Sequence, residues 1–284
     1  MAIATSLRPR SISRSLLRQW QILKAVAFVT YKEWSAFRSH ITVSLLVGPI
    51  YFWVQLFIWK AVYAAKPAIN GFSLEQIISY YGITAMISYL IYDSADWNLQ
   101  MLIHSGKFLT FMLRPVSHQF FALAQKVGHR CLGFWLEFVP IYLIFWFGFR
   151  IRLIPAALGW TMLSIGLSFI LFFQVHYCSG ISAFWLTRNG GVRRMLQLLR
   201  DICAGVFIPL PFFPPVVQKV LFFLPFQFIT YVPVRVFLGS YELAGMHYSI
   251  PQIVGLQALA VLVMAVVTEL LWRLGISQFT GVGA

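Results

Sequence analysis

Charged residues are scarce in this 284-residue sequence. Only 11% of the residues are charged, whereas 60% are hydrophobic and 17% are aromatic, which lies far outside the composition of a soluble domain of this size. A helix that crosses a bilayer core needs roughly 20 mostly apolar residues, and several stretches reach that length with one or two ionisable groups. The scarcity of charge excludes a soluble globular domain and predicts an all-α polytopic membrane protein.

Acidic residues and cysteines are scarcer still. The sequence has 8 acidic against 22 basic residues, a balance that in a soluble protein would suggest nucleic-acid binding. Here the basic residues gather at the ends of apolar stretches, so we expect no nucleic-acid partner. The three cysteines, Cys131, Cys178 and Cys203, lie in or beside apolar stretches at scattered spacing. They predict neither a disulfide framework nor a metal site.

Motifs for catalysis are also missing. The only Gly-Lys pair, Gly106-Lys107, is followed by Phe108, where a phosphate-binding loop needs serine or threonine. No HExxH zinc motif occurs, and Ser179-Gly180 lacks the preceding glycine that is typical of a serine nucleophile. We therefore predict that the chain is not an enzyme and binds no metal or cofactor of its own.

The first forty residues predict an amphipathic helix. Apolar and aromatic residues recur there at helical spacing, whereas most basic residues fall on other faces. The apolar set is Leu16, Trp20, Leu23, Ala27, Tyr31 and Trp34. Such a helix lies in the membrane surface with its cations among anionic lipid head groups. We expect residues 1–40 to form this interfacial helix.

The remainder, residues 41–284, predicts one domain with six transmembrane helices. Their approximate ranges are 42–63, 76–92, 131–149, 158–186, 195–209 and 253–274. Six prolines follow between 209 and 233, and proline removes a backbone donor that a lipid-facing helix needs. We therefore end the fifth span near Pro209. Two half-helices, 216–224 and 227–238, are expected to form a re-entrant outer hairpin within residues 209–240.

The distribution of basic residues predicts the orientation. If both termini are cytoplasmic, sixteen lysines and arginines lie inside and six lie outside, as the positive-inside rule requires. The segment 99–130 is then cytoplasmic, and the proline-rich hairpin faces outward.

Three acidic residues lie in or near the predicted spans. Asp201 adjoins Arg200 and Glu269 precedes Arg273 by four residues, so helical ion pairs at a membrane edge are favoured for both. Glu137 falls well inside the third span, where an ionisable group is kept for a reason. A structural partner on a neighbouring helix is favoured for it, and a role in a transport pathway stays open.

Two segments resemble one known family. The stretch from Ser105 to Phe121, with Leu113-Arg114-Pro115-Val116-Ser117 at its centre, resembles the S-G-x-x-x-x-x-L-L-R-P-V-S-P-x-F segment of permease subunits in the type-2 exporter branch of the ATP-binding cassette (ABC) transporters. It departs from that pattern at Met112 and His118. The order of glycines, prolines and an arginine from Gly205 to Gly239 resembles that superfamily's signature across the fifth span and the outer half-helices.

This resemblance implies partners and a location. Two permease subunits, identical or paralogous, would form a dimer in the bacterial inner membrane, and separate ATP-binding subunits would carry ATP and Mg²⁺. The complex would export an amphipathic or lipid-linked substrate. The short helix near residue 106 would couple the permease to the ATPase within the segment 99–130. The implied coupling residues are Gly106, Lys107, Phe108, Leu109, Thr110, Arg114 and Pro115.

By the same resemblance, the transport pathway would lie between the two subunits and be lined by the first, second and fifth spans. The candidate pathway residues are Phe52, Trp53, Trp59, Tyr80, Tyr81, Glu137, Phe207, Phe212 and Phe213. Aromatic residues in spans also serve ordinary packing, so that alternative stays open. A second alternative is a stand-alone, ion-coupled secondary transporter. Inverted repeats or charge pairs in mid-membrane would support it, and the sequence reveals neither.

Overall fold

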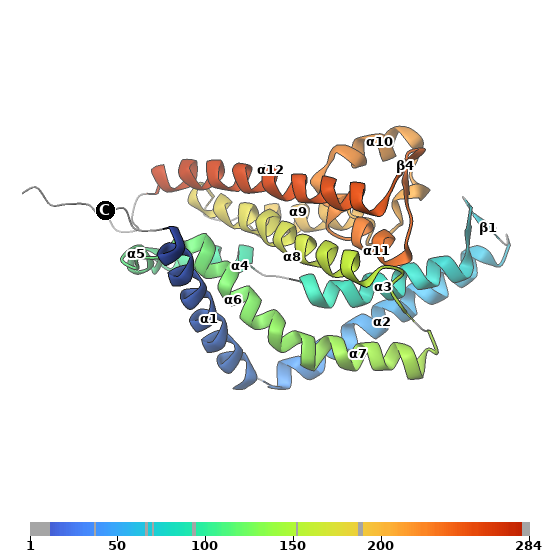
Figure 1. Cartoon of the computed structure of the whole chain (residues 1–284), viewed down its shortest axis with the longest axis horizontal. Helices are drawn as coiled ribbons and strands as arrows, with labels where there is room; N and C mark the ends of the chain where they lie inside the picture. The colour runs from blue at the N-terminus through green and yellow to red at the C-terminus, as the bar shows by residue number, and fades with distance from the viewer. Residues whose placement is uncertain are drawn as a thin grey trace, which may run out of the picture.

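Long helices run side by side along the longest axis of the molecule (Figure 1). The computed structural model describes residues 12–36, 38–65, 68–69, 71–92, 95–151, 153–186 and 190–279. Within these ranges four helices are long and apolar enough to cross a membrane: Leu45–Tyr63, His118–Gly148, Leu158–Phe184 and Ile250–Ser277. The prediction of an all-α polytopic membrane protein is confirmed. The predicted loop residues Lys66, Pro67 and Asn70 lie outside the described residues.

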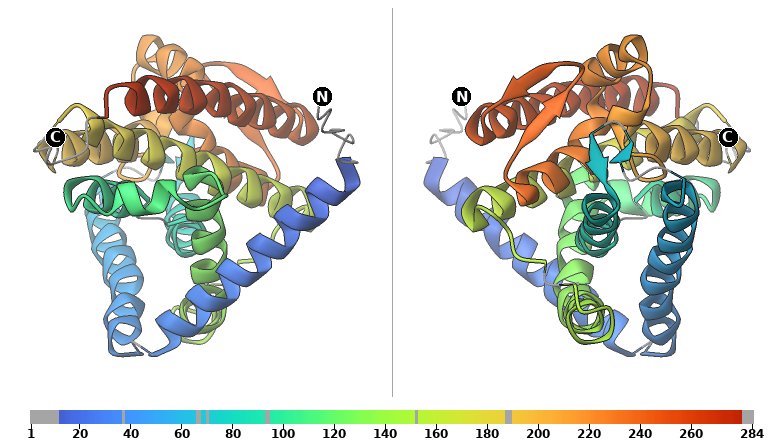
Figure 2. Two further views of the ribbon diagram at one scale, coloured as in Figure 1. Left: turned by 90° about the vertical axis from the view of Figure 1, so that its left-hand side faces the viewer. Right: turned by 90° about the vertical axis from the view of Figure 1, so that its right-hand side faces the viewer.

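Helix α1 (Ile12–Ala36) runs across one end of the bundle (Figure 2). It packs against α6 at Gly128, where a Cβ atom would lie 2.2 Å from the carbonyl oxygen of Ala27. Its outer side exposes Leu17, Trp20 and Phe28, so the helix presents apolar side chains away from the bundle. The expected amino-terminal helix is present, and its position in the membrane surface stays a prediction.

The next elements are an outer helix, a small hairpin at one end of the molecule and a buried helix (Figure 1). They are α2 (Arg38–Tyr63), the hairpin of β1 (Ala68–Ile69) and β2 (Phe72–Ser73), and α3 (Leu74–Ile91). A capping box of Ser73 and Gln76 begins α3, because each side chain satisfies a free backbone N–H group of the other. Most of α3 is buried by other helices. It corresponds to the predicted span 76–92 and carries several tyrosines, which make it less apolar than the four helices above.

A continuous helix of 31 residues follows the short helices α4 (Ala95–His104) and α5 (Phe108–Met112). Its parts are α6 (His118–Gly133), the π-helical turn η1 (Phe134–Phe138), α7 (Val139–Leu143) and the π-helical turn η2 (Ile144–Gly148). Pro140 lies in this helix, and the wider π turns on both sides accommodate the missing backbone donor. The predicted third span, 131–149, is therefore only the second half of a longer helix.

Helix α9 (Gly190–Cys203) differs from the predicted fifth span. It follows α8 (Leu158–Ile181) and the 3₁₀ turn η3 (Ser182–Phe184). Its 14 residues reach only about 21 Å at 1.5 Å per residue, less than the bilayer core. It ends at Cys203, before the predicted end at Pro209, because Gly205 adopts a left-handed φ of 78° that stops a right-handed helix. The predictions for the second and fifth spans remain open.

The proline-rich segment forms the predicted short helices. Its elements are η4 (Leu210–Phe212), α10 (Pro215–Phe223), η5 (Pro225–Phe228) and α11 (Tyr231–Leu238). Prolines occupy the first positions of α10 and η5, where the missing N–H group would have had no helical partner. The hairpin of β3 (Tyr241–Leu243) and β4 (Met246–Tyr248) then leads to α12 (Ile250–Ser277).

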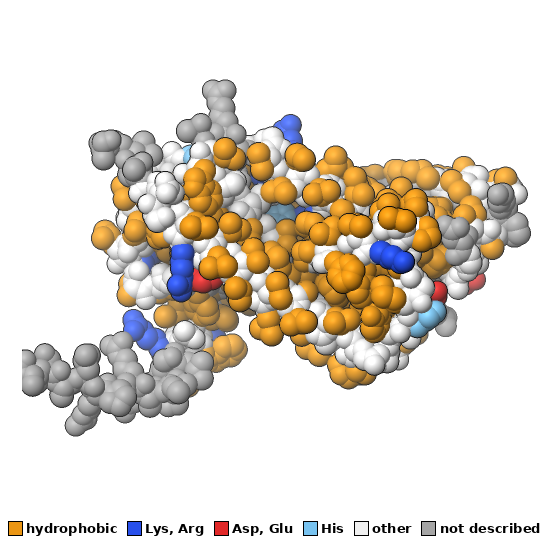
Figure 3. Space-filling model, turned by 90° about the horizontal axis from the view of Figure 1, so that it is seen from above, with side chains coloured by type: hydrophobic (Ala, Val, Ile, Leu, Met, Phe, Trp, Pro, Cys, Tyr) orange, Lys and Arg blue, Asp and Glu red, His pale blue; other side chains and the backbone are white. Residues whose placement is uncertain are grey.

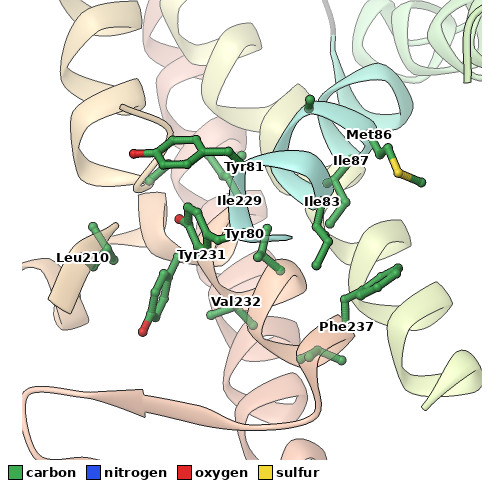
Figure 4. Packing of buried hydrophobic residues seen from close by; sticks show 14 of the residues in the cluster. Tyr80, Tyr81, Ile83, Met86, Ile87, Leu210, Ile229, Tyr231, Val232 and Phe237 are labelled. Carbon is green, nitrogen blue, oxygen red and sulfur yellow. The ribbon is translucent and has the colours of Figure 1, made fainter. Parts of the chain in front are cut away.

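The core lies where α3, α8 and α11 meet. Figure 4 shows Tyr80, Tyr81 and Ile83 of α3 facing Tyr231 and Val232 of α11, and all five side chains are buried. The outer surface is also mostly apolar, as Figure 3 shows for one face. A buried core under an apolar surface is what a protein with lipid as its solvent requires.

Candidate functional site

The predicted coupling segment forms a tight turn and a short helix at the end of the bundle where α12 also ends. Gly106 has a φ of 69°, and an added Cβ atom would meet nothing within 4 Å, so the backbone conformation of the turn, not crowding, favours glycine. Phe108 is 1% exposed. Its ring contacts those of Phe184, Trp272 and Phe279, with centroids 5.2–5.9 Å apart. Phe108 therefore anchors α5 to the bundle, and its role in coupling stays a prediction.

The other side of the coupling segment faces outward. Lys107, Leu109 and Thr110 are exposed, and Leu113 is 85% exposed. Arg114 lies over the rings of Phe111 and Phe121, at 5.3 and 5.4 Å from their centroids. Pro115 is exposed and starts the link to α6. Sequence reasoning missed the prominence of Leu113, because five residues of helix are too few for a periodicity to reveal its faces.

His118 departs from the family pattern and is a buried bridge between helices. Its Nδ1 atom lies 2.9 Å from the Tyr177 hydroxyl of α8. Its ring stacks on Trp272 of α12 with an angle of 11° between planes. This histidine therefore fixes the start of α6 against two spanning helices, just after the coupling turn.

Three tyrosines hold the unwound backbone that follows α9. The hydroxyl groups of Tyr80, Tyr51 and Tyr81 donate hydrogen bonds of 2.7 Å to the carbonyl oxygens of residues 205, 206 and 207, respectively. Unwound backbone at membrane depth is tolerated only where protein satisfies it. The predicted pathway residues Tyr80 and Tyr81 thus serve the fold of one chain, and Tyr51 is a third member that the sequence did not reveal.

The other predicted pathway aromatics divide into buried and exposed residues. Phe52 is fully buried, and Phe212 is half-buried with its ring 5.1 Å from that of Trp59. Trp53 and Phe207 are 56% and 40% exposed. Only the last two present much of their surface outside the chain.

Glu137 forms an ion pair within its own helix. Arg130 lies 3.4 Å from the carboxylate and also donates a hydrogen bond of 2.6 Å to the carbonyl oxygen of Tyr89 in α3. The role of Glu137 in a transport pathway stays a prediction. The predicted ion pair of Glu269 with Arg273 is present at 2.7 Å.

A buried charge cluster joins α4, α8 and α9. Asp96 of α4 is 1% exposed, and its Oδ2 atom accepts a hydrogen bond of 2.5 Å from Arg193 Nε of α9. Arg200 donates to His176 Nε2 of α8, and His176 Nδ1 lies 3.5 Å from Asp96 Oδ1. Arg200 also forms the predicted pair with Asp201, at 2.6 Å. Arg193 thus pairs with Asp96 and Arg200 pairs with Asp201, while His176 lies between Arg200 and Asp96.

Asp96 is charged in this cluster. Burial raises the pKa of its carboxyl group, but the His176 contact and the Arg193 hydrogen bond outweigh burial and hold the pKa below its ordinary value. The sequence signal for this cluster was the spacing of Arg193, Gln197 and Arg200, which places them on one face of a helix. Asp96 gave no such signal, because it lies 97 residues from Arg193 in the sequence.

These observations first define the structural class of the protein. The fold is that of a multi-pass membrane protein in which buried polar groups join neighbouring helices and the predicted coupling turn lies at one end. A family model described as ABC-2 family transporter protein matches residues 50–283, and the chain therefore belongs to the ABC-2 transporter family. The resemblance seen in the sequence is confirmed. No curated protein and no solved structure matches the chain.

Proposed function

We propose that this chain is the membrane-spanning permease subunit of an ABC exporter, energised by separate ATP-binding subunits. The observation that carries the proposal is the family match over residues 50–283. A second permease subunit, identical or paralogous, completes the pathway in the bacterial inner membrane. Both termini are cytoplasmic, and ATP and Mg²⁺ bind to the partner subunits.

The contact with the ATP-binding subunit centres on Leu113. This side chain lies directly after α5, and Phe108 at the start of α5 is packed into the bundle. A force on Leu113 is therefore transmitted to the bundle through α5. Burying a leucine contributes about 1.5–3 kcal/mol. Lys107 beside it favours an acidic rim on the partner's cleft.

We place the exposed rings of Trp53 and Phe207 in the pathway, against the second permease. These two rings are the exposed members of the predicted set, whereas Phe52, Tyr80 and Tyr81 support them from inside. Phe212 and Glu137 stay candidates at its edge. Low charge along this pathway favours an amphipathic or lipid-linked cargo over a free ion.

The test is purification of the chain with an ATP-binding subunit encoded beside it. We expect a stable complex with vanadate-sensitive ATP hydrolysis. Leu113→Asp should abolish the association, and Leu113→Met should preserve it. Val216→Asp, at a 75% exposed valine of α10 near the other end of the molecule, serves as the matched control. Hydrolysis and association unchanged in Leu113→Asp would overturn the coupling assignment.

One observation favours the secondary-transporter alternative. The structure contains a buried charge pair, Asp96 with Arg193, of the kind that ion-coupled transporters use. That reading predicts uptake driven by an ion gradient in vesicles without ATP. The exporter proposal predicts no such uptake.

A further inference from the structure

Few apolar contacts hold α9 against the rest of the chain. Its outward side exposes Met195, Leu198 and Leu199. The inward side carries Arg193 and Arg200, which reach Asp96 and His176. Hydrogen-bonded charges near both ends of this helix therefore hold it in place, where a usual helix would have a buried apolar stripe.

The direction of each hydrogen bond follows from the chemistry of the donors. An arginine can only donate, so His176 Nε2 accepts from Arg200, and a neutral His176 carries its proton on Nδ1. The Nδ1 nitrogen lies 3.5 Å from Asp96 Oδ1, a close polar contact without a hydrogen bond. Arg193 thus binds Asp96 directly, whereas Arg200 reaches it only through the imidazole ring of His176.

A small cavity lies beside this carboxylate. It measures about 10 Å³ and is lined by Asp96, His176 and Ser179, among others. Asp96 Oδ1, His176 Nδ1 and Ser179 Oγ are buried and have no hydrogen-bond partner within the described chain. The cavity has the size and the polar lining of a site for one water molecule.

A single helix connects Asp96 to the proposed coupling turn. Asp96 lies in α4, which leads through Gly106 into α5. At Gly180 of α8, a Cβ atom would lie 3.1 Å from the Asp96 Cα atom, so α4 and α8 are in close contact. The backbone that follows α9 is held differently, by hydrogen bonds from three tyrosines of α2 and α3 to residues 205–207.

We propose that Asp96 is the positioning residue that clips α9 to the coupling segment, so that a displacement of the coupling turn is passed to the helix beside the transport pathway. The transmission of a displacement rests on the proposed function. The attachment of α9 through Asp96 does not, and it can be tested in the isolated chain.

The test measures the distance between α4 and α9. Spin labels are placed at Asn98→Cys and Arg194→Cys, both exposed positions, after the three native cysteines are replaced, and the chain is held in lipid nanodiscs. We expect one narrow distance distribution. Asp96→Asn and Arg193→Gln should each broaden it, and the double variant should be no broader than either single variant, because both remove one interaction.

Glu269→Gln removes an exposed carboxylate from an ion pair on α12 and should leave the distribution unchanged. A narrow distribution in both Asp96→Asn and Arg193→Gln would overturn the proposal, whether or not the chain belongs to an exporter.

In the complex with ATP-binding subunits, ATP and vanadate should shift the distance between α9 and α3 in the unmodified cluster. Asp96→Asn should reduce the shifted population about tenfold while ATP is still hydrolysed. An equal shift in that variant would contradict the link to the coupling segment.

Discussion

At the residue scale, buried hydroxyl groups donate hydrogen bonds that apolar side chains cannot supply in a membrane. The hydroxyl groups of Tyr51, Tyr80 and Tyr81 each satisfy one carbonyl group of the unwound stretch after α9. Because lipid offers no replacement donor, the loss of one hydroxyl leaves a carbonyl group without a partner. These residues are therefore sensitive to very small changes.

Tyr80→Phe tests one of these hydrogen bonds. Removing the hydroxyl leaves the Gly205 carbonyl oxygen unsatisfied in a buried site, which costs about 1–3 kcal/mol. We expect a lower melting temperature of the purified protein in nanodiscs. Tyr92→Phe, at a tyrosine that is 54% exposed, should melt like the unmodified protein. Equal melting of all three proteins would contradict the role of the hydroxyl.

Gly205→Ala tests the turn itself. An added Cβ would lie 2.8 Å from the Tyr80 hydroxyl oxygen, at a φ of 78° that disfavours side chains. We expect a larger loss of thermal stability than for Tyr80→Phe. The control is Gly255→Ala in α12, where nothing lies within 4 Å of the new atom. Its melting temperature should stay the same or rise. If Gly205→Ala melted like this control, the tight turn would not be needed.

At the element scale, the two glycine contacts of α6 and α8 decide how helices approach each other. Gly128 permits α1 to touch α6, and Gly180 permits α4 to touch α8. Neither contact follows from hydrophobic periodicity, because glycine is counted as a neutral residue in such patterns. The structure shows that both glycines serve close backbone approach.

Gly128→Leu should displace α1. The new side chain would collide with backbone atoms of Ala27, which cannot move aside without moving the helix. We expect faster cleavage of α1 by a protease added to nanodiscs. Gly159→Leu, at a glycine with open space around it, is the matched control and should be cleaved at the original rate. Equal rates for both variants would show that α1 does not depend on this contact.

Several elements could be predicted from the sequence because their signals are local. Pro215 and Pro225 lie at the starts of α10 and η5 and indicated short helices there. Long apolar runs indicated the spanning helices. The limits of α9 could not be predicted, because they depend on Gly205 and on tyrosines that lie 125, 126 and 155 residues from their partners in the sequence. The charge cluster was missed for the same reason, since Asp96 and Arg193 are 97 residues apart.

At the scale of the whole molecule, the chain has two differently built ends. One end carries the proposed coupling turn, the His118 bridge and the charge cluster around Asp96. Aromatic contacts hold the turn, and hydrogen bonds join the helices at the other two. The other end carries the proline-limited short helices and the β3–β4 hairpin (Figure 1). The proposed ATPase contact at the first end, through Leu113, is the central claim about function.

Photo-crosslinking from position 113 tests that claim most directly. A photoreactive amino acid replaces Leu113 in one variant and Val216 in another, and cells that also express the adjacent ATP-binding subunit are irradiated. We expect a crosslinked permease–ATPase product from position 113 and none from position 216. Crosslinking from position 216 alone, or from neither position while the two subunits still copurify, would contradict the account.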